Sequence, residues 1–172
     1  MSTNPLISTV SYLLYASIIL HVVVAIILSS ANKSARPVKY KQLNAKENSS
    51  WESRSMALLG ILVLAFILLH LKDFWWQYKF GGSYQFSEDT NGNRDIYALV
   101  VQQFSTTFGL ISYLIGLLAL FFHLKHGFQS AFQTLGINHH KYTPAIKKLG
   151  LSYSTIVPLC FAATPVYLYF FT

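Results

Sequence analysis

The chain has 172 residues, 53% of them hydrophobic and only 11% charged. A soluble domain carries about 25% charged residues, so this composition indicates an integral membrane protein. The formal net charge is +7, but the basic residues stand between apolar blocks, where they flank membrane segments, so we expect lipid and no nucleic acid as a partner. Cys160 is the only cysteine, which excludes an internal disulfide, a cysteine-rich zinc site and c-type haem attachment within this chain.

Two apolar segments occupy the first half of the chain. The first covers about residues 6–30 and holds no formal charge, so it is long enough to cross a bilayer. A cleavable signal peptide is disfavoured, because no basic region precedes this segment and because it is too long for the apolar part of a signal. The second covers about residues 56–78 and ends around Trp75 and Trp76, an aromatic belt typical of the membrane–water boundary.

Two further apolar segments follow a loop rich in glycine and asparagine. We predict one helix over residues 96–135, longer than a bilayer requires, with Gly136 as its C-cap. The fourth segment covers about residues 149–171 and contains two prolines, which membrane helices tolerate when neighbouring helices satisfy the freed backbone groups. The predicted fold class is an all-α integral membrane bundle of four transmembrane helices, in one domain over residues 1–172.

The basic residues of the connections predict the orientation, because short cytoplasmic loops carry an excess of lysine and arginine. The first connection holds Lys33, Arg36, Lys39, Lys41, Lys46 and Arg54. The third holds Lys125, Lys141, Lys147 and Lys148, with no acidic residue over 124–150. In the middle connection, acidic residues offset the basic ones, so it carries no excess of positive charge. We therefore place the first and third connections in the cytoplasm and expect a multi-pass protein of the cell's inner membrane, with both termini outside.

Three histidines fall inside the predicted spans, where ionisable side chains are costly and are candidate functional residues. His21 and His123 both come late in segments that run from the outside to the cytoplasm, so we expect them at the same depth. His70 comes late in a segment that runs the other way, which places it in the outer half of the membrane. Depth therefore pairs His21 with His123 and leaves His70 unmatched.

Small side chains surround His123 on one helical face. They stand four and seven residues away on either side: Gly116, Ala119, Gly127 and Ser130. Ser17 and Ala25 flank His21 in a similar way. Two imidazoles that face each other across small residues suit a bis-histidine b-type haem, which transfers electrons because its iron has no open position. The same small residues also suit a helix-packing face, and that alternative stays open.

Other polar residues have supporting interpretations. We place His126 at the membrane boundary, in contact with a haem propionate or a partner subunit. Asp73, one turn beyond His70, is either a proton relay or a plain boundary carboxylate, and the sequence favours the second. No His-x-x-x-His or His-Glu-x-x-His motif occurs, so metals other than haem iron are weaker candidates. The alternative for every intramembrane histidine is a hydrogen bond between packed helices.

Several stretches are specific enough to compare with known proteins. The strongest reads His-Leu-x-His-Gly-Phe-Gln-Ser-Ala-Phe-Gln-Thr-Leu-Gly from His123, followed by Lys-Tyr-Thr-Pro-x-Ile-Lys-Lys from Lys141. Others are Asn-Pro-Leu-Ile from Asn4, Ala-Arg-Pro-Val-Lys-Tyr from Ala35, Ser-Ser-Trp-x-Ser-Arg-x-Met from Ser49 and His-Leu-x-Asp-Phe-Trp from His70. Over nearly its whole length the chain resembles the b558-type di-haem cytochrome b membrane-anchor subunit of succinate dehydrogenase and fumarate reductase.

The resemblance implies a five-helix subunit with four haem-ligating histidines, and the four segments here resemble its helices 2–5. Three ligands fall on His21, His70 and His123. The first and third would bind the haem nearer the iron–sulfur subunit, and His70 would serve the outer haem together with a histidine from the family's first helix. That first helix has no counterpart before Met1, so we expect a truncated gene, a mis-assigned start or a partial chain, and an outer haem only if a missing first helix supplies its other ligand.

We therefore expect an electron-transfer subunit of succinate:quinone oxidoreductase, without succinate chemistry of its own. It would anchor the flavoprotein and iron–sulfur subunits at the cytoplasmic face and pass electrons through haem b to a quinone, with Asp73 as a candidate for the quinone site. The boundary residues that would pair with haem propionates or dock the partner are Arg36, Arg54, Lys125 and His126. The alternatives are a haem-free membrane anchor and a small proton-translocating protein that uses His70 and Asp73.

Overall fold

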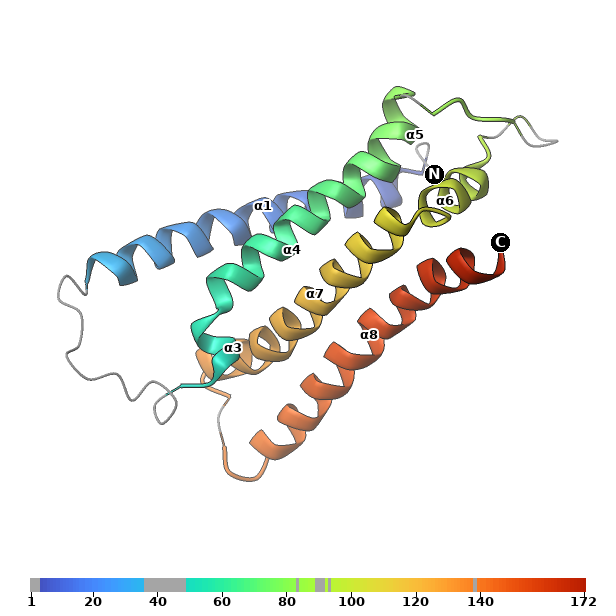
Figure 1. Cartoon of the computed structure of the whole chain (residues 1–172). Coiled ribbons are helices and arrows are strands. Elements are labelled where there is room, and N and C mark those ends of the chain that lie inside the picture. The colour runs from blue at the N-terminus through green and yellow to red at the C-terminus, as the bar shows by residue number, and fades with distance from the viewer. Residues whose placement is uncertain (1–3, 36–48, 83, 89–91, 93, 138) are drawn as a thin grey trace. The chain divides into compact units, whose positions relative to one another are not determined.

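The computed structural model describes residues 4–35, 49–82, 84–88, 92, 94–137 and 139–172. The chain divides into two compact units, Met1–Glu47 and Asn48–Thr172. In the first unit, helix α1 (Pro5–Ser34) is the described element, and in the second unit the helices follow one another as labelled in Figure 1.

Helix α1 has a defined start and an apolar surface. The side chain of Asn4 accepts the backbone N–H of Leu6 at 2.9 Å, and Pro5 takes the first helical position, where a missing N–H costs nothing. No described residue of α1 is buried, and its 30 residues exceed the roughly 20 that a bilayer requires. The predicted first span is therefore present and reaches four residues further, to Ser34.

The second span is a continuous helical rod with one wider turn inside it. The short helix α3 (Trp51–Arg54) precedes α4 (Met56–His70), which passes into the π-helix η1 (Leu71–Trp76) and then into α5 (Gln77–Phe80). The rod ends at Gly81, whose φ of 65° is left-handed and favours glycine. A π-helical turn is rare and often marks a functional site, and this one begins directly after His70.

The third segment forms two helices, so the prediction of a single helix over residues 96–135 is wrong. Helix α6 (Ile96–Phe104) ends before Ser105, and α7 (Thr107–Thr134) begins after Thr106, whose backbone is extended. Hydroxyl side chains cause the break, because serine and threonine compete with the helix for its backbone groups. Ser105 donates to the carbonyl of Val101 at 2.7 Å, and Thr106 caps α7 by accepting the N–H of Gly109 at 3.0 Å.

The turn between α7 and α8 (Thr143–Phe171) follows the predicted cap. Gly136 has a φ of 74°, its N–H donates to Gln133, and the N–H of Ile137 donates to Phe132 at 3.0 Å. This pair of bonds is the Schellman arrangement that closes many helices. Helix α8 begins at Thr143, earlier than the predicted residue 149, with a proline in its first turn where proline is favoured.

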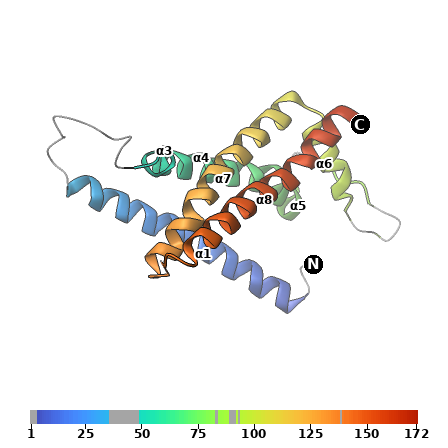
Figure 2. The ribbon, with the colours of Figure 1, turned by 90° about the horizontal axis from the view of Figure 1, so that it is seen from below.

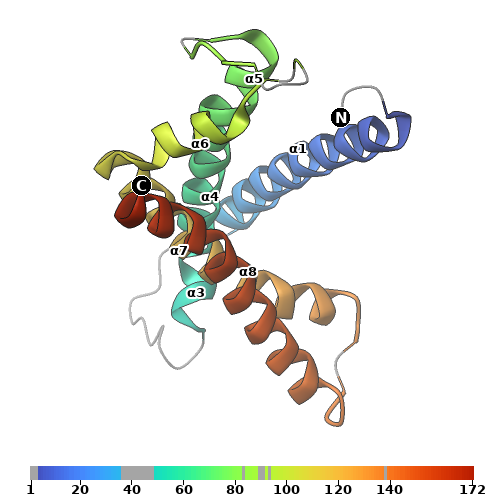
Figure 3. The ribbon, with the colours of Figure 1, turned by 90° about the vertical axis from the view of Figure 1, so that its right-hand side faces the viewer.

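In the second unit, α7 packs against α4 and against α8. Figure 2 shows α7 and α8 running side by side, and Figure 3 shows α6 set at an angle to α7. Four helical stretches among the described residues are long and apolar enough to cross a membrane: Pro5–Ser34, Met56–Phe80, Thr107–Thr134 and Thr143–Phe171. The predicted all-α integral membrane fold with four spans is confirmed.

The small-residue face around His123 packs against α4. Gly116 lies under the ring of Phe66, so closely that an added Cβ would overlap that ring. Further along, Cε1 of His123 lies 3.7 Å from the position that a Cβ on Gly60 would take. Gly127 comes similarly close to α4, at the side chain of Met56. Small residues let two membrane helices approach closely. The structure thus favours the helix-packing interpretation of this face over a groove for a flat ligand.

We predict that Gly116→Ala destabilises the second unit by about 1–3 kcal/mol, because the rigid Phe66 ring must shift to admit a methyl group. Gly127→Ala is the matched control on the same helix: its Cβ would lie 3.8 Å from the methionine methyl, an ordinary contact, so we expect little change. Unfolding in mixed detergent, followed by circular dichroism, measures both. Equal stability of the two variants would contradict the packing described.

Candidate functional site

An apolar pocket of about 420 Å³ opens in the second unit beside His70. This volume lies within the range of small-molecule sites, about 300–1,000 Å³. Helices α4, η1, α6, α7 and α8 all contribute to its lining. The aromatic part of the lining consists of Phe66, Phe74, Phe104, Tyr113 and Phe161. The lining is therefore suited to a flat, apolar ligand.

His70 is the one imidazole among the described residues that line this pocket. It is the last residue of α4, at the start of the π turn. Aromatic rings surround it: the ring centroids of Phe74, Tyr113 and Phe66 lie 5.2, 6.1 and 6.4 Å from its own. An imidazole can bind haem iron or another transition-metal centre.

Asp73 lies buried behind the pocket and is only 5% exposed. Its Oδ2 accepts a hydrogen bond from Nε2 of Gln103 at 2.9 Å and one from the hydroxyl of Tyr113 at 3.3 Å. Its Oδ1 is 3.0 Å from Nζ of the more exposed Lys72. A buried carboxylate is tolerated when donors satisfy it in this way. Asp73 is therefore not a plain boundary carboxylate, the interpretation that the sequence favoured.

Tyr113 connects the carboxylate to the pocket. Its hydroxyl bonds to Asp73 while its ring lines the pocket, packed edge-on against Phe104 at 4.9 Å and Phe66 at 5.3 Å between centroids. We did not predict a role for Tyr113 or for Gln103. The sequence does hold a clue to both residues. A tyrosine hydroxyl and an amide inside apolar helices each need a hydrogen-bond partner, and the carboxylate of Asp73 is an acceptor within another apolar segment.

The other predicted site residues of α7 lie in its C-terminal half. His123 is half-buried against Gly60. His126 shares a hydrogen bond of 3.0 Å with Ser130, within its own helix. Lys125 forms an ion pair of 2.7 Å with Glu52 of α3. Beside this pair, the rings of Trp51 and Phe122 pack edge-on at 5.3 Å. α3 is thus anchored to α7 by charge and by aromatic contact.

Two predicted residues lie outside the second unit. His21 is exposed on α1, in the first unit. Its pairing with His123 stays a prediction, because the two histidines belong to different units. Arg36 lies outside the described residues. Arg54, at the end of α3, donates to the backbone carbonyl of Ser49. The structure therefore brings His70, Tyr113 and Asp73 together, a set that the sequence did not predict as a whole.

The variant Tyr113→Phe tests the buried cluster. It keeps the aromatic packing and removes one donor to Asp73, so we expect a loss of about 1–2 kcal/mol of stability. Tyr153→Phe on α8, whose residue is 47% exposed, is the matched control and should change stability little. Detergent unfolding of both variants measures the effect. If Tyr113→Phe matched its control, the hydrogen bond from Tyr113 to Asp73 would contribute nothing to stability.

The Glu52–Lys125 pair predicts an acid-sensitive contribution to stability. The hydrogen bond from Lys125 lowers the pKa of Glu52 from 4.5 to about 2. Since the pKa is lower in the folded state, the contribution is complete above pH 4.5 and declines as the pH falls towards 2. The pair lies near the surface, so its size is at most about 1 kcal/mol. A double-mutant cycle of Glu52→Gln and Lys125→Met should show a coupling energy near neutral pH that decreases in acid. A pH-independent coupling would contradict the assignment.

Neither a protein-family model nor a curated protein nor a solved structure matches the chain. The chemistry of the site therefore follows from its own residues. These are an imidazole and a tyrosine ring at the wall of an apolar pocket, with a buried carboxylate behind the tyrosine. Such a combination can hold a flat apolar group through one ligand and offer hydrogen-bonding groups at its edge.

Proposed function

We propose that the chain is a cytochrome b membrane-anchor subunit of succinate:quinone oxidoreductase, carrying electrons from an iron–sulfur subunit to a quinone through haem b. One observation carries the proposal: the imidazole of His70 lies at the wall of an aromatic-lined pocket within a membrane span. The stretches that begin at His70 and His123 resemble the b558 family, and this resemblance supports the choice of succinate:quinone oxidoreductase as the complex.

The residues around His70 fit a haem. Haem b takes an axial imidazole and apolar, largely aromatic walls, and the pocket offers both. Bound there, haem supplies one-electron transfer. His70 would hold its iron, and the rings of Phe66 and Phe104 would exclude water from its faces. The second axial imidazole would come from a further helix, as the resemblance implies.

In the same proposal, His21 and His123 hold the haem nearer the iron–sulfur subunit. Since α4 already covers Gly116 and Gly127, this haem would sit beside His123 and not in a groove formed by those glycines. Its propionates would lie near the cytoplasmic boundary, where we also place His126. The flavoprotein and iron–sulfur subunits would dock at this face, next to α3.

We place the quinone near the Asp73 cluster. Reduction of a quinone to a quinol takes two electrons and two protons, so the site needs hydrogen-bonding groups that face an apolar space. The hydroxyl of Tyr113 and the carboxylate of Asp73 are such groups, and the ring of Tyr113 separates them from the pocket that the haem would fill. Asp73 therefore acts as a positioning residue for Tyr113 in this proposal, and the electrons would arrive through the haem at His70.

The proposal predicts a b-type signal that depends on His70. We expect the purified full chain to show a b-type α-band in its reduced-minus-oxidised spectrum. His70→Ala should lose the haem that is bound in the pocket and keep the haem that is bound elsewhere. His140→Ala, in the exposed turn before α8, is the matched control and should leave the spectrum unchanged. His123→Ala reports on the other haem. A folded wild-type chain without the band would refute the proposal.

A second candidate function rests on the buried Asp73, one helical turn from His70. A haem-free protein could use this carboxylate and imidazole to move protons across the membrane. In that case, proteoliposomes of the haem-free chain would conduct protons, and Asp73→Asn would abolish the conductance. The cytochrome proposal expects no such conductance, so the two functions are separable.

A further inference from the structure

We propose that the cytoplasmic end of α7 and α8 binds the anionic head group of a phospholipid. A second pocket of about 300 Å³ lies there, between the end of α7 and the beginning of α8. It is separate from the pocket beside His70, with no lining residue in common. Its lining residues are Gln129, Phe132, Gln133, Ile137, Thr143, Ile146 and Lys147.

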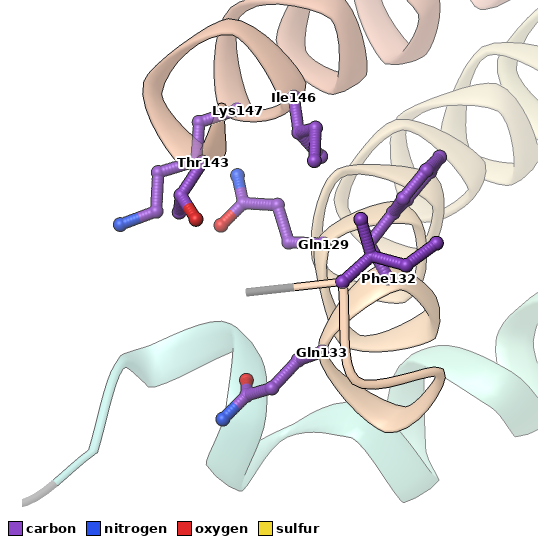
Figure 4. A pocket seen from close by; sticks show the side chains of 7 residues that line it. Gln129, Phe132, Gln133, Thr143, Ile146 and Lys147 are labelled. Atoms are coloured by element: carbon purple, nitrogen blue, oxygen red, sulfur yellow. The ribbon is translucent and has the colours of Figure 1, made fainter. Parts of the chain in front are cut away.

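The polar part of this lining suits a phosphate group. Two carboxamides and one ammonium group are donors to phosphate oxygens, and the ammonium of Lys147 makes such a hydrogen bond charge-assisted. Figure 4 shows Gln129 of α7 reaching towards Thr143 and Ile146 of α8. The polar side chains of Gln129 and Thr143 therefore face a shared space, and Gln133 and Lys147 border it further out.

The charge around the pocket is positive. Residues 124–150 contain no acid, and Glu52 of α3 is paired with Lys125. Within the described part of the chain, no carboxylate lies in ion-pair range of Lys147. An anion that enters the pocket would therefore meet uncompensated positive charge. By the orientation predicted from the basic loops, this end faces the leaflet that carries the anionic lipids.

The apolar part of the lining favours a lipid over a free anion. Phe132, Ile137 and Ile146 give one side of the pocket a surface for a glycerol backbone or the start of an acyl chain. The pocket also lies where two membrane spans meet their connecting turn, and that is the depth at which phospholipid head groups are found. A basic pocket between membrane helices at the cytoplasmic side is a known setting for anionic lipids. An acidic peptide would use the charge but not this apolar surface.

The inference is independent of the proposed function. It depends on the end of α7, the start of α8 and their charges, and no haem takes part. A chain that binds no haem would still bind the lipid, and a chain that binds haem could fail to do so. Lipid binding and the haem spectrum therefore test the two proposals independently of each other.

The test measures binding of phosphatidylglycerol to the full chain by native mass spectrometry from detergent. Phosphatidylcholine, inorganic phosphate and a polyglutamate peptide are the comparison probes. We expect retention of phosphatidylglycerol, little phosphatidylcholine and no measurable inorganic phosphate or peptide. Lys147→Gln should weaken phosphatidylglycerol binding by about tenfold, as the loss of one charge-assisted hydrogen bond predicts.

Lys148→Gln is the matched control, because it removes the same charge from the adjacent residue, which does not line the pocket. We expect it to change binding by no more than about twofold, since exposed charges outside the site are screened. Equal losses in the two variants would overturn the proposal in favour of diffuse surface attraction. Equal binding of the zwitterionic lipid, of inorganic phosphate or of the peptide would also overturn it. Circular dichroism verifies that both variants are folded.

Discussion

The close contact between Gly116 and Phe66 is the constraint on which the described site depends. Because Gly116 has no side chain, the Phe66 ring lies directly on the backbone of α7. The same ring packs edge-on against Tyr113 and lines the pocket beside His70. One missing methyl group thus sets the separation of α4 and α7, and through Phe66 it sets a wall of the pocket. Packing and candidate function are coupled at this point.

The buried carboxylate of Asp73 adds a second constraint. Burying it inside the protein is costly unless donors surround it, and the hydrogen-bond donors Gln103 and Tyr113 come from two other helices. Gln103 lies at the end of α6 and Tyr113 lies in α7, so the cluster ties η1 to both. The break at Ser105 and Thr106 separates these two donors into helices of different direction (Figure 3). The hydroxyl residues that stop α6 therefore help to build the site.

Composition and local chemistry were sufficient to predict much of this fold. Long apolar segments predicted the four spans, and Gly136 predicted the end of α7, because both depend on local properties of the chain. The break between α6 and α7 was not predicted, since the apolar character continues through it and only three hydroxyl residues mark it. The sequence also left open how the small residues around His123 are used, because glycine spacing suits helix packing and ligand binding equally, and only the tertiary contacts show that Gly116 and Gly127 pack against α4.

The site was predictable only in part, for a related reason. An intramembrane histidine can be recognised from the sequence, and His70 was. Its neighbours Tyr113 and Asp73 stand 40 residues apart in the sequence, so their hydrogen bond depends on how η1 is placed against α7. The proposed haem ligation by His21 with His123 stays a prediction from depth and resemblance. The pocket beside His70, in contrast, is present in the structure.

The central claim is that the pocket beside His70 holds haem iron. Crystals of the full chain, purified from membranes, allow its most direct measurement: an anomalous difference map at the iron absorption edge. The account predicts an iron peak next to the imidazole of His70, inside the pocket lined by Phe66, Phe104 and Tyr113. A pocket filled by lipid or by side chains, with no iron peak beside His70, would contradict it.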